Sequence, residues 1–175
     1  MTSEAAEIES LDVERQDGRI YVSASLILDA PVPLVFQALS DYEHFAELST
    51  RFKESRFLET APDEAPRIYT EVEGCVWFFC RTVRRYAQLE LIPYVRITAT
   101  VEPAESDVSY GVESWELATL RNATRVSYTH EMEPKFWVPP VVGLWAIRRV
   151  LNKDALESAS RIEALALEKD SASNE

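Results

Sequence analysis

Residues 139–167 read PPVVGLWAIRRVLNKDALESASRIEALAL, and this stretch decides the fold. On a helical wheel of 100° per residue, one narrow stripe collects the apolar and small side chains of Leu144, Ile147, Leu151, Ala155, Ser158, Ile162 and Leu165. The opposite side carries Arg149, Lys153, Glu157 and Arg161. The two prolines suit a helix entrance, where their missing N–H groups would have no partner. The pattern predicts a C-terminal helix about 40 Å long that lies across one large sheet.

The chain upstream begins with a predicted hairpin and two short helices. Asp17-Gly18 separates strand-like runs over 11–15 and 19–28, which is a hairpin signal. Asp29 and Pro31 suit the opening of a helix, and a second helix is expected over 41–48 with Asp41 as its cap. We expect residues 1–10 to form a flexible lead-in and 169–175 a polar tail, so that one domain spans 11–168.

The middle of the chain predicts successive strands. They are placed near 51–60, 66–73, 78–91, 94–102, 108–119 and 124–133, separated by stretches rich in turn-forming residues such as Ala61-Pro62-Asp63-Glu64 and Pro103–Asp107. The connections are short, so the strands should pair as an antiparallel meander.

Composition restricts the class of partner. The chain has 175 residues, enough for one domain with a sizeable core, and its 46% hydrophobic and 27% charged residues are ordinary for a globular protein. Its formal net charge of −12 repels a phosphate backbone, so no nucleic acid is expected as a partner. We found no internal repeat.

Targeting signals and membrane spans are not expected. Residues 136–147 form the longest nearly apolar run, which is too short and too broken by proline and glycine to span a bilayer. The first nineteen residues are polar and acidic, unlike a secretion signal. The expected location is the cytoplasm, with membrane association left open.

The two cysteines, Cys75 and Cys80, are expected to be reduced and buried. In one continuous strand they would point to opposite faces, roughly 16 Å apart and beyond disulfide reach, whereas a turn between them would change that. With two histidines in the whole chain, a zinc site is not expected.

The order of elements predicts the fold class. A strand, two short helices, a run of strands and a C-terminal helix give an α+β helix-grip fold, in which a curved antiparallel sheet of about six to seven strands wraps around the last helix. Ala30-Pro31, Val35-Phe36, Leu39 and Asp41-Tyr42 resemble the start of the START-like polyketide cyclase/dehydrase and lipid-transport superfamily (SRPBCC). Gly111, Trp115-Glu116-Leu117, the segment 124–128 and Pro139-Pro140 are similar to its later elements. Among its members, the chain looks most like the coenzyme-Q-binding proteins.

This resemblance implies a cavity between sheet and helix for a hydrophobic molecule. Strand alternation places Arg81 and Arg85 on the face that carries Val83, and Glu113 on the face that carries Trp115. His130 shares a face with Tyr128. Buried charges need partners, so these polar groups either orient a ligand or form an internal ion pair that binds nothing. A bulge in the strand would send the arginines outward.

No residue is predicted to be catalytic. His130 is expected to be a hydrogen-bonded core histidine, His44 lies on the surface, and no nucleophile–base pair has diagnostic spacing. No cofactor or metal is expected either.

The predicted ligand-binding set combines apolar walls with polar groups. It comprises Phe79, Arg81, Val83, Arg85, Glu113, Trp115, Leu117, Tyr128, His130, Leu144, Ile147 and Leu151. Phe136, Trp137 and Trp145 either plug the end of the sheet or form a lip for transient membrane contact.

Three functions remain open at this point. The first is binding or transport of a lipid, an isoprenoid quinone or a polyketide-like molecule. The second is a cyclase or aromatase, as in relatives of the superfamily. The third is a ribosome- or protein-interaction module, which would require a basic patch from Arg148 and Arg149 beside Arg81, Arg84 and Arg85.

Overall fold

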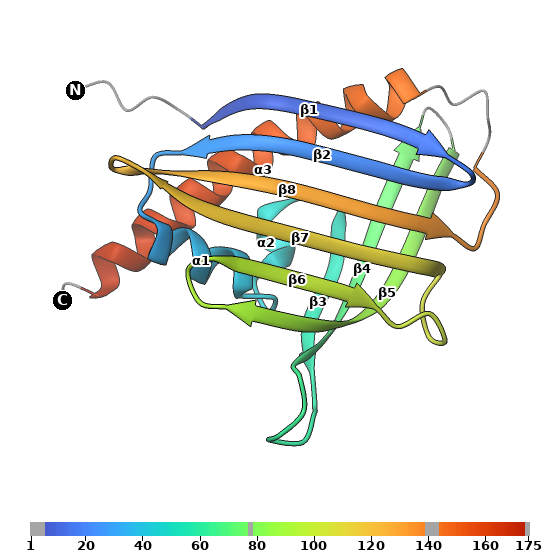
Figure 1. Cartoon of the computed structure of the whole chain (residues 1–175), viewed down its shortest axis with the longest axis horizontal. Coiled ribbons are helices and arrows are strands. Elements are labelled where there is room, and N and C mark those ends of the chain that lie inside the picture. Colours follow the sequence, from blue (N-terminus) through green and yellow to red (C-terminus); the bar gives the residue numbers. More distant parts are fainter. Residues whose placement is uncertain (1–5, 77–78, 139–143, 174–175) are drawn as a thin grey trace.

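The computed structural model describes residues 6–76, 79–138 and 144–173, and its centre is one eight-stranded antiparallel sheet. The strands are β1 (Glu7–Gln16), β2 (Arg19–Leu28), β3 (Phe52–Leu58), β4 (Arg67–Val76), β5 (Phe79–Ile92), β6 (Arg96–Val101), β7 (Val108–Leu120) and β8 (Ala123–Pro134). Their order is β1-β2-β8-β7-β6-β5-β4-β3, and the sheet bends so strongly that β4 and β5 run across the direction of β1 and β2 (Figure 1).

The strand prediction was close, with two corrections. The sheet has eight strands, where six to seven were expected. The first of them starts at Glu7, inside the stretch predicted to be a flexible lead-in, because β1 pairs with β2 up to Glu7 opposite Ile27. The Asp17-Gly18 hairpin is confirmed, since both residues adopt positive φ (51° and 87°) as a two-residue turn requires.

Two short helices follow β2, as predicted. Helix α1 (Val32–Ser40) starts directly after Pro31 and buries Val35, Ala38 and Leu39. Helix α2 (Phe45–Leu48) is shorter than the predicted 41–48, because His44, and not Asp41, occupies its N-cap. The Asp41 carboxylate instead lies 3.0 Å from the His44 ring nitrogen Nδ1.

The C-terminal helix α3 (Leu144–Ser173) has 30 residues and passes behind the strands (Figure 1). Of its predicted stripe, Ile162 is buried and Ala155, Ser158 and Leu165 are partly buried. Among the described residues, α3 contacts mainly α1 and β1, and to a lesser extent α2 and β2. Glu163 fixes it there by accepting hydrogen bonds from the backbone N–H groups of Ala6 and Asp29. The helix therefore packs toward one edge of the sheet, and it continues past residue 168, the expected end of the domain.

The hydrophobic core lies where α1, α2 and the second half of α3 meet the sheet. It contains Leu28, Val35, Leu39, Ile68 and Ile97, which are all fully buried. Tyr42, which follows α1, stacks on Phe45 with ring centroids 4.6 Å apart and is fully buried as well.

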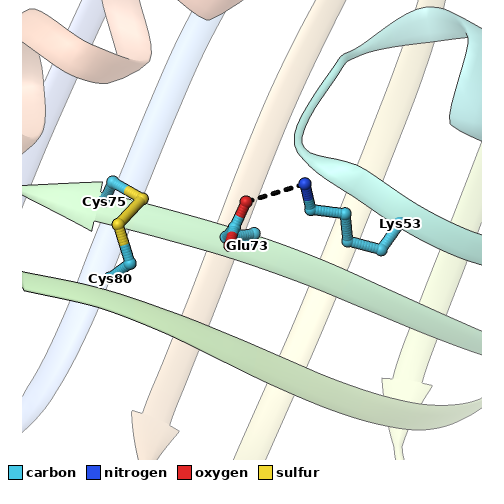
Figure 2. Close-up of a disulfide and its surroundings, with 4 residues drawn as sticks. All are labelled: Lys53, Glu73, Cys75 and Cys80. Atoms are coloured by element: carbon cyan, nitrogen blue, oxygen red, sulfur yellow. Dashed lines mark ion pairs between the residues drawn. A yellow bond between two sulfur atoms is a disulfide. The ribbon is translucent and has the colours of Figure 1, made fainter.

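The cysteines form a disulfide, so the prediction of two reduced, buried thiols was wrong (Figure 2). The reason is that the chain reverses between β4 and β5, which makes Cys75 and Cys80 directly opposite partners on neighbouring strands. Cys80 is exposed and Cys75 is partly buried. On the β3 side of β4, Lys53 and Glu73 form an ion pair of 2.7 Å (Figure 2).

Candidate functional site

The inner face of the sheet brings together side chains from four strands. The register places Glu113 of β7 opposite His130 of β8, and Trp115 opposite Tyr128. On the other arm of the sheet, Thr70 of β4 lies opposite Arg85 of β5. The β4–β5 register runs without a shift from Arg67 to Val76, which excludes the bulge that would have turned Arg85 outward.

Arg85 and Glu113 form a buried ion pair at the centre of this face. The Arg85 Nη1 and Glu113 Oε2 atoms lie 2.7 Å apart, and the two residues are 9% and 6% exposed. Arg85 Nε also donates to Thr70 Oγ1, and the Tyr128 hydroxyl donates to Glu113 Oε1 at 3.0 Å. Of the two alternatives left open by the sequence, an internal ion pair does form, between Arg85 and Glu113, while a role in orienting a ligand stays untested.

The pair remains charged although it is buried. Burial raises the pKa of Glu113, but attraction to Arg85 and the hydrogen bonds from Arg85 and Tyr128 outweigh it, so the pKa lies below its ordinary value. Burial likewise lowers the pKa of Arg85, and the charge of Glu113 more than restores it. The result is a zwitterionic pair with no net charge.

His130 stands beside this pair as a neutral imidazole. Burial is the largest cause that lowers its pKa, from 6.5 to about 4, and the charge of Arg85 lowers it further while Glu113 opposes the shift. Its ring lies 6.3 Å from that of Tyr128, and part of the side chain is accessible to solvent. A neutral histidine donates one hydrogen bond through the ring nitrogen that carries the proton and accepts one at the other ring nitrogen.

Sequence reasoning missed two polar residues of this cluster. Tyr42 was noted only as part of a family motif, yet the charges of Glu113 and Arg85 reach its hydroxyl and burial raises its pKa. Thr70 holds Arg85 and is fully buried. The sequence showed only that Tyr42, an aromatic residue with a polar hydroxyl group, lies between two predicted helices. That position does not indicate which strand residues the hydroxyl group approaches.

The structure removes Arg81 from the cluster. Its side chain is exposed, and its guanidinium lies over the Phe136 ring, 4.5 Å from the centroid. Arg81 shares the inward-pointing alternation of Arg85 but lies four residues nearer the start of β5, where its side chain is exposed. The prediction that both arginines are buried together was wrong for Arg81.

The predicted apolar set has a mixed outcome. Leu117 is buried, whereas Val83, Trp115, Tyr128 and Leu151 are partly buried. The side chains of Phe79, Leu144, Ile147 and Trp145 lie outside the described part of the structure, as do the prolines at 139 and 140. Phe136 is partly buried under Arg81 and Trp137 is 72% exposed, so the lip stays a prediction.

Three of the five arginines predicted for a basic patch have acidic partners. Arg85 is buried against Glu113, Arg84 pairs with Asp107, and Arg148 pairs with Asp12. Each of these three cations has a carboxylate within 3.4 Å, whereas Arg81 and Arg149 are exposed, so the interaction module stays a prediction.

A groove of about 890 Å³ lies elsewhere, between β1 and α3. Its lining includes Ile8, Leu11, Arg149 and Leu156 but none of the residues predicted to bind the ligand.

In the described segments, no three His, Cys, Asp or Glu side chains are grouped to hold a metal ion. No described helix is long and apolar enough to cross a membrane.

Solved structures with this fold include an aromatase/cyclase. The START superfamily protein from Mycobacterium smegmatis is 17% identical over 83% of this chain and 98% of its own, with a TM-score of 0.66. The Zhui aromatase/cyclase from Streptomyces sp. R1128 is 16% identical over 85% of this chain and 93% of its own, with a TM-score of 0.62. These identities show a shared fold.

Sequence comparison gives the family directly. Among curated proteins, none matches this chain in sequence. A family model described as polyketide cyclase / dehydrase and lipid transport matches residues 28–155, which include α1, α2, β3 to β8 and the Arg85–Glu113 pair. The chain therefore belongs to the polyketide cyclase/dehydrase and lipid-transport family.

Proposed function

We propose that this protein binds and carries a hydrophobic small molecule between the inner face of the sheet and α3, without chemical conversion. The single observation that carries the proposal is the environment of the Arg85–Glu113 pair. Trp115, Tyr128 and His130 adjoin this buried pair, yet all three side chains remain partly accessible. A small polar centre with aromatic and apolar walls is the usual composition of a small-molecule site.

Family membership supports the same proposal at a coarser level, since the family description includes lipid transport. We infer a lipid, an isoprenoid quinone or a polyketide-like molecule as ligand, which includes the earlier proposal of a coenzyme-Q-binding-like protein. The residues proposed as lining are Val83, Trp115, Leu117, Tyr128 and Leu151, with Phe79, Leu144 and Ile147 retained from the sequence prediction.

A second candidate is a cyclase or aromatase. The observation that favours it is the neutral His130 next to the Glu113–Tyr128 hydrogen bond, because such a set can move a proton to or from a bound polyketide. Three of the similar structures are named as aromatase/cyclases, among them Zhui and the di-domain StfQ from the steffimycin pathway. This candidate would be favoured over a carrier if the wild type converts a bound polyketide and the variant His130→Gln still binds the polyketide but no longer converts it.

The carrier is tested by native mass spectrometry of the purified protein, followed by organic extraction. We expect about one hydrophobic molecule per chain. The inner-face variant Val83→Phe should reduce the bound fraction, and Thr82→Phe, on the exposed outer face of the same strand, is its matched control. A wild-type protein that carries nothing and whose melting temperature does not respond to quinones or lipids would contradict the proposal.

A further inference from the structure

The groove between β1 and α3 follows an open edge of the sheet. β1 is the outermost strand, and within the described chain its only strand neighbour is β2 (Figure 1). Residues 6–11 line one side of the groove, and Arg148, Arg149, Asn152 and Leu156 of α3 line the other. The outward backbone N–H and C=O groups of an edge strand are able to pair with a further strand.

β1 and α3 run in opposite directions along this groove. Glu163 accepts a hydrogen bond from the N–H of Ala6, just before β1, whereas Arg148 pairs with Asp12 at 3.4 Å. Arg149, the neighbour of Arg148, therefore lies at the Asp12 end of the groove.

Two side chains of opposite charge stand at opposite ends of the groove. Glu7 and Arg149 are both exposed, and neither forms an ion pair within the described chain. Glu7 and Asp12 are five residues apart, roughly 16 Å along a strand, so Glu7 does not reach the Arg149 end of its own chain. Glu9, between them, is already paired with Arg125 at 2.9 Å.

A second copy of the chain fits this arrangement. When a two-fold axis lays the β1 strands of two copies side by side, they are antiparallel, so the residue order is reversed across the interface. Glu7 of one copy then comes to the Arg149 end of the other copy's groove, and the symmetry forms the same contact a second time. Burial of Ile8 and of Leu156, which is 45% exposed, adds an apolar contribution.

We propose that the protein forms a two-fold dimer in which the β1 edges of two copies pair antiparallel. Glu7 of each copy forms an ion pair with Arg149 of the other, and the sheet continues from one copy into the next. This interface lies at the edge of the sheet, away from the inner face, so it forms with or without a bound ligand.

Sedimentation equilibrium of the full-length protein over a concentration series measures the dimer. We expect the mass of two chains. Glu7→Arg and Arg149→Glu should each weaken the dimer at least about tenfold, because each change sets two like charges against each other and the two-fold axis repeats it. Glu14→Arg and Lys153→Glu are the matched controls, since both residues are exposed on the same strand and helix but do not line the groove.

An equimolar mixture of the two weakened variants, Glu7→Arg and Arg149→Glu, tests whether the contact joins two chains. One chain is then basic at both positions and the other acidic at both, so the mixture should restore the dimer as a heterodimer, which a contact within one chain cannot produce. A dimer that both variants leave intact, or a mixture that stays monomeric, would overturn the proposal.

The wild type alone provides the second decisive result. A protein that stays monomeric up to about 100 μM, above the weakest dissociation constants of standard-size interfaces, would also overturn the proposal. The open edge of β1 would then be left to an extended segment of another protein.

Discussion

The guanidinium of Arg85 lies 2.7 Å from the carboxylate of Glu113, and the two side chains are only 11% and 8% exposed. They come from β5 and β7, which are not neighbours in the sheet because β6 lies between them. The pair therefore crosses a strand on the inner face, where the curvature of the sheet brings these two long side chains together. It also sets the charge of the proposed ligand site to zero.

Removing one partner of this pair should destabilise the fold. Glu113→Gln leaves a buried Arg85 without its counter-charge, and we expect the free energy of unfolding to fall by about 3 kcal/mol. The comparison variant is Glu90→Gln, because Glu90 pairs with Arg96 at an exposed site and should contribute little. Urea denaturation measures both. If both variants lose the same small free energy of unfolding, the view that the Arg85 and Glu113 charges depend on each other is contradicted.

Acidification should destabilise the protein through His130. The pKa of His130 is about 4 in the folded chain and near 6.5 when unfolded, so the unfolded state binds its proton first as the pH falls. Stability is thus fully present above about pH 6.5 and declines toward pH 4, by on the order of 3 kcal/mol in total. The lowered pKa of Glu113 acts in the same direction at still lower pH.

The measurement is denaturation at a series of pH values on the wild type and His130→Gln. The variant should lose most of the decline between about pH 6.5 and 4. NMR signals of His130 that titrate near pH 6.5 would contradict its placement beside Arg85.

The disulfide between Cys75 and Cys80 should stabilise the β4–β5 hairpin. It closes a short loop, with a sequence separation of 5, so reduction is expected to lower the free energy of unfolding by about 2 kcal/mol. The double variant Cys75→Ser/Cys80→Ser should be equally destabilised and insensitive to reductant. Rapid maleimide labelling of both cysteines in protein that has not been treated with a reductant would show that the disulfide does not form.

Gly111 should not tolerate a side chain. A Cβ at this position would lie 2.6 Å from Cγ2 of Val101, and a β-branched valine cannot easily turn away. Gly111→Ala should therefore cost about 1–3 kcal/mol by overpacking, and Val101→Ala in the same chain should recover part of that loss. Gly74→Ala is the control, because its nearest contact, the Arg81 carbonyl, is 3.9 Å away. Thermal melts of the three variants give the comparison.

Local sequence determined the strands and the face on which each side chain lies. The two-residue period of a strand puts one side chain in two of β2 on a common face. The structure buries Ile20, Ala24, Leu26 and Leu28 on this face and leaves Val22 partly buried. The same period correctly put Glu113 with Trp115 and His130 with Tyr128. The turn at Asp17-Gly18 could be predicted because it depends on two backbone dihedrals that few other residues adopt.

Only the tertiary structure decided how deeply each of these side chains is buried and which side chain it contacts. Arg81 and Arg85 have the same alternation, but only Arg85 reaches Glu113, because coverage depends on sheet curvature and on strands distant in sequence. Cys75 and Cys80 became partners once the chain reversed between them, which a strand period cannot reveal. Tyr42 entered the polar cluster through the packing of α1 and α2 against the sheet. Sequence periodicity is a property of a few neighbouring residues, whereas a binding site requires contacts across the whole chain.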